Sequence, residues 1–124
     1  MTFLSDNVLD NGLNYLTTHG SRMDICSQEP ANYTEATSTY SKGNKTSVAC
    51  GSPTNGDSSG RKVTIGAVTG GSVTGTATVT HWAYSKTTST TELLAAKSLS
   101  SSQGVTSGNS WSMAAIDIEI PDAT

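Results

Sequence analysis

The longest apolar pattern of the chain lies near its C-terminal end, over residues 110–120. Side chains of an extended strand alternate between two faces, so apolar residues two positions apart share a face. Trp111 and Met113 share one phase of this alternation, and three isoleucines share the other phase (Ile116, Ile118 and Ile120). The phase changes at Ala114 and Ala115, which predicts a β-bulge that turns both apolar sets toward one core.

Shorter alternating segments predict partners for this strand. We expect strands over 21–27, around 45–49, over 61–68, over 73–84 and over 92–98, with a brief edge around Val105. The residues expected to face inward on the 61–68 strand are Val63, Ile65 and Ala67. Clusters of Gly, Pro, Asn, Ser and Thr predict turns at 43–44, 51–60, 69–72, 85–91, 100–104 and 107–109. Residues 31–45 follow no regular pattern.

The segment 5–19 has the pattern of an amphipathic helix, the only one predicted in the chain. Ser5 is placed to cap its first turn, and Gly20 is placed to end it. One apolar stripe runs along the segment at helical spacing (Leu9, Leu13 and Leu16). A single stripe suits a helix that lies on a sheet. A helix that docks on a partner protein is the alternative interpretation.

These elements predict a mainly β fold, namely a small antiparallel β-sandwich with one N-terminal α-helix packed on it. The length favours one domain, residues 1–124, with the helix over 5–19 and the sandwich over 21–120. Charged residues make up 14% of the chain, against roughly 25% in average proteins. Abundant Ser and Thr replace them, as is usual on the solvent faces of antiparallel sheets.

Charge and hydropathy argue against two classes of partner. The net charge is -3 and no cluster of Lys or Arg occurs, so nucleic acid is not an expected partner. No apolar run approaches the roughly 20 residues of a membrane-spanning helix, so a membrane is not expected either. The first residues lack the basic and apolar regions of a signal peptide, and we therefore expect synthesis in a cytoplasm.

The chain has two cysteines, Cys26 and Cys50, which do not form a CxxC pair. Two buried or idle thiols are the simpler interpretation. The alternative is a disulfide, within the chain or between subunits, which would form by oxidation outside the cell.

Several short patterns resemble chemical motifs without completing them. Residues 56–61 are similar to the segment around a trypsin-like serine nucleophile, but the fourth position differs and a polar turn is the better interpretation. His19 and His81 have no further metal ligands at defined spacing. Asp117 and Glu119 share a strand face and are expected to face water, as solubilising residues rather than a glycosidase pair. We assign no catalytic, cofactor-binding or metal-binding residue, and we predict a non-enzymatic protein.

Four aromatic side chains suggest a contact patch for sugar stacking or for a protein partner (Tyr33, Tyr40, Trp82 and Tyr84). The alternative is that core packing uses most of them.

Several segments resemble small structural proteins of tailed bacteriophages and prophages. The segments are Leu4–Asp10, Arg22–Pro30, Gly60–Val63, Thr80–Ala83, Leu93–Ala96, Gln103–Asn109 and Ile116–Pro121. The resemblance covers nearly the whole chain, and none of the matched residues belongs to a catalytic motif. It implies a β-rich virion protein, made in the host bacterial cytoplasm and incorporated into the particle.

From this resemblance we expect a capsid decoration or cement protein that stabilises the head through oligomeric contacts. The implied partners are the major capsid protein or other virion proteins, and further copies of this chain in a homo-oligomer. The alternatives are a tail, neck or fibre component, and a receptor- or glycan-binding module displayed on the particle.

Overall fold

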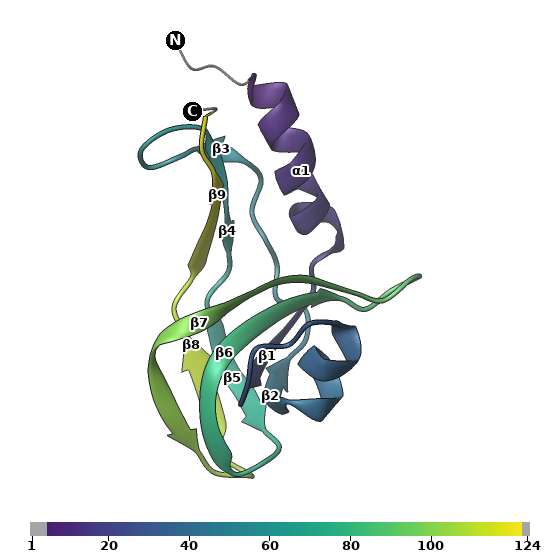
Figure 1. Cartoon of the computed structure of the whole chain (residues 1–124), viewed down its shortest axis with the longest axis vertical. Helices are drawn as coiled ribbons and strands as arrows, with labels where there is room; N and C mark the ends of the chain where they lie inside the picture. Colours follow the sequence, from purple (N-terminus) through teal and green to yellow (C-terminus); the bar gives the residue numbers. More distant parts are fainter. Residues whose placement is uncertain (1–4, 123–124) are drawn as a thin grey trace.

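Antiparallel strands are the main secondary structure of the computed structural model, which describes residues 5–122 (Figure 1). One N-terminal helix and two sheets pack together, so the predicted fold class is confirmed. The predicted domain ran from 1 to 124, and its residues 1–4 and 123–124 lie outside the described residues. The elements are α1 (Asp6–His19), β1 (Arg22–Cys26), η1 (Glu35–Thr39), β2 (Ser41–Lys45), β3 (Thr54–Asn55), β4 (Arg61–Ile65), β5 (Val68–Val73), β6 (Ala77–Lys86), β7 (Glu92–Val105), β8 (Ser110–Met113) and β9 (Ile116–Ile120).

The strands form two sheets in which all neighbours are antiparallel. The larger sheet has six strands in the order β7-β6-β1-β2-β5-β8, and the smaller has three in the order β3-β4-β9. In Figure 1 the larger sheet curls through the lower half of the molecule, while β4 and β9 rise from it beside α1. The main core fills the space that the curled sheet encloses and continues under the helix.

The helix α1 forms as the sequence predicts. The Ser5 hydroxyl accepts a hydrogen bond from the backbone N–H of Val8 (3.4 Å), and the helix ends where the Gly20 N–H donates to the carbonyl of Leu16 (2.9 Å). Leu9 and Leu13 are buried in the interface with β4 and β9. The apolar stripe therefore covers a sheet.

Strand β1 is buried on both faces. Met23 and Ile25 point into the main core, whereas Asp24 and Cys26 point to the opposite face. That second face is covered by the short π-helical segment η1, which the sequence pattern did not predict and whose Ala36 is fully buried. The segment 31–45 is therefore a cover for the sheet followed by a strand, rather than an irregular region.

Two glycine-containing segments predicted as turns are strands. Gly43 lies within β2, where a Cβ atom would come within 2.6 Å of the Ser72 carbonyl oxygen. Gly71 lies within β5, where a Cβ atom would overlap the ring of Trp111. At both positions glycine permits close packing between strands rather than a reversal of the chain.

The predicted strand bounds shift accordingly. The strand expected around 45–49 is wrong beyond its first residue, because β2 ends at Lys45 and residues 46–49 form no strand. The alternating run 73–84 is divided between β5 and β6. Ala67 is exposed in the connection between β4 and β5, whereas Val63 and Ile65 are buried as predicted. Strand β7 continues through residues 100–104, where the sequence predicted a turn.

The C-terminal segment is two strands rather than one bulged strand. Its first part, β8, pairs with β5 in the larger sheet, and its second part, β9, pairs with β4 in the smaller sheet. Ala114 and Ala115 are exposed where the chain passes from one sheet to the other. The change of apolar phase marks this change of sheet, because each part aligns its side chains with a different set of neighbours.

Candidate functional site

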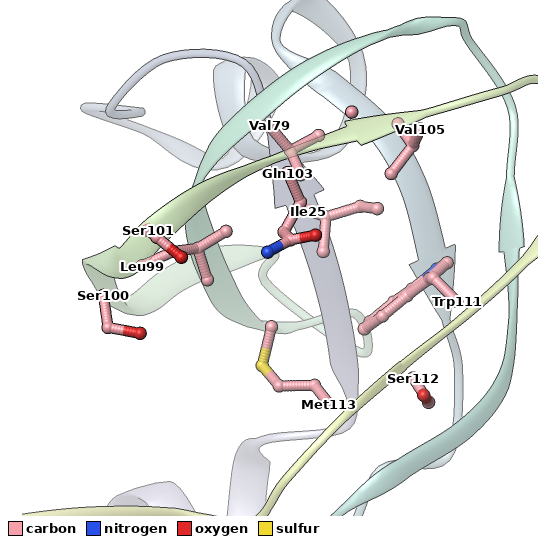
Figure 2. A pocket seen from close by; sticks show the side chains of 11 residues that line it. Ile25, Val79, Leu99, Ser100, Ser101, Gln103, Val105, Trp111, Ser112 and Met113 are labelled. Atoms are coloured by element: carbon pink, nitrogen blue, oxygen red, sulfur yellow. The ribbon is translucent and has the colours of Figure 1, made fainter.

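The candidate site is a groove between β7 and β8, the two edge strands of the six-stranded sheet (Figure 2). It has a volume of about 330 Å³. Both edges line the same hollow because the sheet curls until its first and last strands face each other. The apolar residues that line it are Ile25, Val79, Leu99, Val105, Trp111 and Met113.

A bulge in β7 shapes one wall of the groove. Val79 pairs with Gln103 and His81 pairs with Ser98, so residues 99–102 of β7 all lie opposite Thr80 alone. Such an insertion bends a strand and redirects its side chains. Here it carries Leu99 against the main core, while the serines that follow remain exposed.

Trp111 forms most of the opposite wall. Its ring lies over Gly71 of the neighbouring strand, and its Nε1 donates a hydrogen bond to the carbonyl of Ser72 (3.1 Å). The indole is thereby held at the edge of the core with only 8% of the residue exposed. Sequence reasoning placed Trp111 in the core, and a tryptophan near the edge of a sheet gave no separate signal for a groove.

The polar groups of the groove are uncharged. No Asp, Glu, Lys, Arg or His is among its lining residues, whereas serines and Gln103 are. Figure 2 shows the amide of Gln103 projecting toward the middle of the hollow, between Leu99 and Ile25. An apolar floor with a few uncharged hydrogen-bonding groups is typical of a binding site rather than of acid–base chemistry.

The backbone of the groove has free hydrogen-bonding capacity. Among the described strands, β7 pairs only with β6, and β8 pairs only with β5. An edge strand presents a row of N–H and C=O groups to whatever lies beside it. Two such rows border this groove.

The predicted aromatic contact patch is wrong for two of its four residues. Trp82 is 5% exposed and Tyr84 is fully buried, and both belong to the main core. The Tyr84 hydroxyl donates to the Val48 carbonyl (2.6 Å), and burial raises the pKa of this phenol. Tyr40 packs on the small cluster beneath η1, and Tyr33 lines a separate hollow of about 440 Å³. Of the four residues of the predicted patch, Tyr33 and Tyr40 are partly exposed.

Both cysteines are buried and free. Cys26 packs with Ala36 and Ala83 beneath η1, whereas Cys50 belongs to the main core. Burial, followed by the nearby charge of Asp24, raises the pKa of Cys26 to about 12, and burial raises the pKa of Cys50. The structure therefore agrees with the interpretation of two buried thiols.

An ion pair lies on the same face of β1 as Cys26. The Asp24 side chain is fully buried and accepts hydrogen bonds from Arg22 Nε (2.7 Å), Arg22 Nη2 (2.9 Å) and the Ser41 hydroxyl (2.6 Å). Arg22 Nη2 also donates to the Thr37 carbonyl of η1 (3.2 Å). Arg22 thus connects the carboxylate to η1, and Asp24, with both oxygens paired, is not available as a reactive base.

The other candidate groups are dispersed. Residues 56–60 form the tight connection between β3 and β4, and His19 packs against Tyr15. Asp117 is exposed and accepts hydrogen bonds from the Thr64 hydroxyl and the Lys62 ammonium group. Both groups lower the pKa of this carboxyl. Within residues 5–122, no three His, Cys, Asp or Glu side chains are grouped so that they could hold a metal ion.

Comparisons with family models, with curated proteins and with solved structures find no match to this chain. None of the helices within residues 5–122 has the length and apolar character needed to cross a membrane.

Proposed function

We propose that this chain is a non-enzymatic structural protein of a tailed-phage particle, and specifically a decoration protein that reinforces the capsid. The observation that carries the proposal is the uncharged groove bordered by two open strand edges. Such a site suits stable contact with other protein chains. The phage particle enters the proposal through the resemblance of most of the sequence to small phage structural proteins.

The surface composition supports a role in assembly. Only 14% of the residues are charged, and many exposed strand positions carry Ser or Thr. Interface cores are depleted in charged residues, because a charge that leaves water must find a partner. A surface of this kind can be covered by neighbouring subunits, including copies of the same chain and the major capsid protein.

The hairpin of β6 and β7 provides a second contact element. It extends from the body of the molecule as a long arm, with residues 87–91 at its tip (Figure 1). The tip consists of threonines and one serine, and all five residues are exposed. A projecting arm with an uncharged tip can reach a neighbouring subunit in a shell, which favours a particle protein over an isolated monomer.

The aromatic residues give less support to the glycan-binding alternative. Stacking against sugar rings requires exposed aromatic faces, and two of the four proposed side chains lie in the core. The proposal therefore gives priority to protein partners.

The test is quantitative mass spectrometry of purified particles, with heads and tails separated. A copy number close to that of the major capsid protein, in the head fraction, is the expected result. A few dozen copies or fewer, confined to tails or necks, would replace decoration by the tail, neck or fibre alternative. Absence from the particle would refute a virion role.

A further inference from the structure

We propose that the groove between β7 and β8 is a strand-acceptor site, which binds an extended, uncharged segment of another protein as an added β-strand. The proposal does not depend on the phage setting. It concerns only the chemistry of the groove and of the segment that would fill it.

The hydrogen-bonding groups of the groove specify an extended polypeptide. The edge of β8, and that of β7 beyond the bulge at residues 99–102, offer backbone donors and acceptors at the spacing of a β-strand, about 3.3 Å per residue. Only another extended chain carries alternating N–H and C=O groups at that spacing along both of its sides. A strand inserted here would continue the antiparallel sheet from one edge or join its two edges.

The arrangement of the two edges favours a single strand as the occupant. An edge that faces open solvent can pair with the edge of a second folded sheet. Here each edge instead faces the other across the same hollow, since residues of both strands line it. This arrangement favours a single extended segment, such as a loop or a tail, over the edge of a second folded sheet. Strand β8 has four residues, which sets the scale of the paired segment.

The side chains of the groove specify the composition of that segment. Its floor is formed by Ile25, Val79 and Trp111, which are buried or nearly so, with Leu99 and Met113 at the sides. In a bound strand, alternate side chains would point to this floor, so they should be apolar. No charged residue lines the groove to pair with a charge, so the inserted stretch should be uncharged.

Gln103 gives the site a group that can be tested. Its side chain projects into the hollow in Figure 2, and the residue itself is exposed, so a change here should not disturb the fold. Gln103→Glu keeps the size of the side chain and introduces one negative charge into the groove. Ser98→Glu is the matched control, because Ser98 is an exposed residue of the same strand that does not line the groove.

The experiment is a titration of the isotopically labelled full-length chain, observed by amide NMR. The probe is an acetylated and amidated heptapeptide of alternating threonine and valine, with a terminal lysine pair for solubility. We expect shifts of the amide signals of Leu99–Val105 and Ser110–Met113. Gln103→Glu should weaken binding by about tenfold or more, since an unpaired charge is costly to enclose, while Ser98→Glu should leave binding unchanged.

A second peptide, N-methylated at alternate residues, keeps the side chains and removes donors from one side. It should bind more weakly. Equal binding of both peptides would overturn the proposal, because the groove would then be an apolar pocket that does not use strand pairing. Shifts confined to other elements, or no shifts at millimolar peptide, would also overturn it. Shifts of the same amides upon concentrating the protein without peptide would identify a second copy as the occupant, against our assignment of another protein.

Discussion

Removing the guanidinium of Arg22 should destabilise the fold more than removing any exposed partner of an ion pair. In the variant Arg22→Met, the carboxylate of Asp24 would stay fully buried and would keep only the hydrogen bond from Ser41. The methionine preserves much of the apolar length of the side chain, so the variant tests charge pairing rather than packing. The variant also removes the hydrogen bond from Arg22 to η1.

The expected loss follows from the burial of the two partners. Breaking a buried ion pair by removing one member typically costs about 3–5 kcal/mol, because the remaining charge has no compensation. The Arg22 side chain is 22% exposed and Ser41 remains as a donor, so we expect about 3 kcal/mol, at the low end of this range. Domains of this size have a total free energy of unfolding of about 5–15 kcal/mol, so the variant should lose a substantial part of it.

Urea unfolding followed by circular dichroism measures this loss. With a denaturant slope of about 2 kcal/mol/M, the midpoint should fall by about 1.5 M. Arg61→Met is the control, since Arg61 pairs with Asp10 (2.8 Å), whose carboxylate remains 26% exposed. This variant also removes the hydrogen bonds from Arg61 to Asn55 (2.8 Å) and to the Pro53 carbonyl (3.3 Å), which are not part of the pair. The control should shift the midpoint less, because water can solvate the carboxylate that is left.

A second comparison separates the pair from its surroundings. The double variant Arg22→Met/Asp24→Leu removes both charges and should be more stable than Arg22→Met alone. The reasoning would be refuted if Arg22→Met shifted the midpoint no more than Arg61→Met does. It would also be refuted if the double variant were the less stable of the two.

Three further predictions concern the thiols, the close-packed glycines and the response to acid. Cys26 and Cys50 should not react with Ellman's reagent in the native chain, because burial raises the pKa of both thiols. After denaturation without reductant, two thiols per chain should react. If no thiol reacts under those conditions, the two cysteines form a disulfide. Gly43→Ala should lower the free energy of unfolding by about 1–3 kcal/mol through overpacking. Gly104→Ala should leave the melting temperature nearly unchanged, because a Cβ atom there meets nothing within 4 Å. Equal effects of the two variants would contradict the packing argument. The pKa of Asp117 is lowered in the fold, so its stabilising contribution is present above the unfolded pKa of about 4 and is lost as pH falls through the folded pKa. Asp117→Asn should therefore reduce the fall in melting temperature between about pH 4 and pH 2. If the variant shows the same fall as the original chain, the pKa of Asp117 is not lowered.

The local elements were predictable where neighbouring residues in the chain decide the conformation. Helix α1 follows from a capping serine and a stripe of leucines at helical spacing, and the structure places both as expected. The mainly β class follows in the same way from period-two alternation. Both signals act between residues a few positions apart, so the conformations they predict depend little on the tertiary contacts of the rest of the chain.

The errors at glycine have one common reason. A glycine permits a turn, and it equally permits two strands to approach closely. At Gly43 the deciding neighbours are Ile25 and Ser72, and at Gly71 the deciding neighbour is the ring of Trp111. These neighbours come from other strands, so the sequence around the glycine could not distinguish the two uses.

The sequence by itself determined the helix, the strand-forming character of most segments and the low proportion of charged residues in this protein. Only the tertiary structure decided that residues 110–120 serve two sheets, that Trp82 and Tyr84 belong to the core, and that the edges β7 and β8 face each other across a groove. The physical reason is the range of the interactions. Capping and alternation are set by residues a few positions apart, whereas strand order, curl and burial depend on contacts between residues that the sequence separates by dozens of positions.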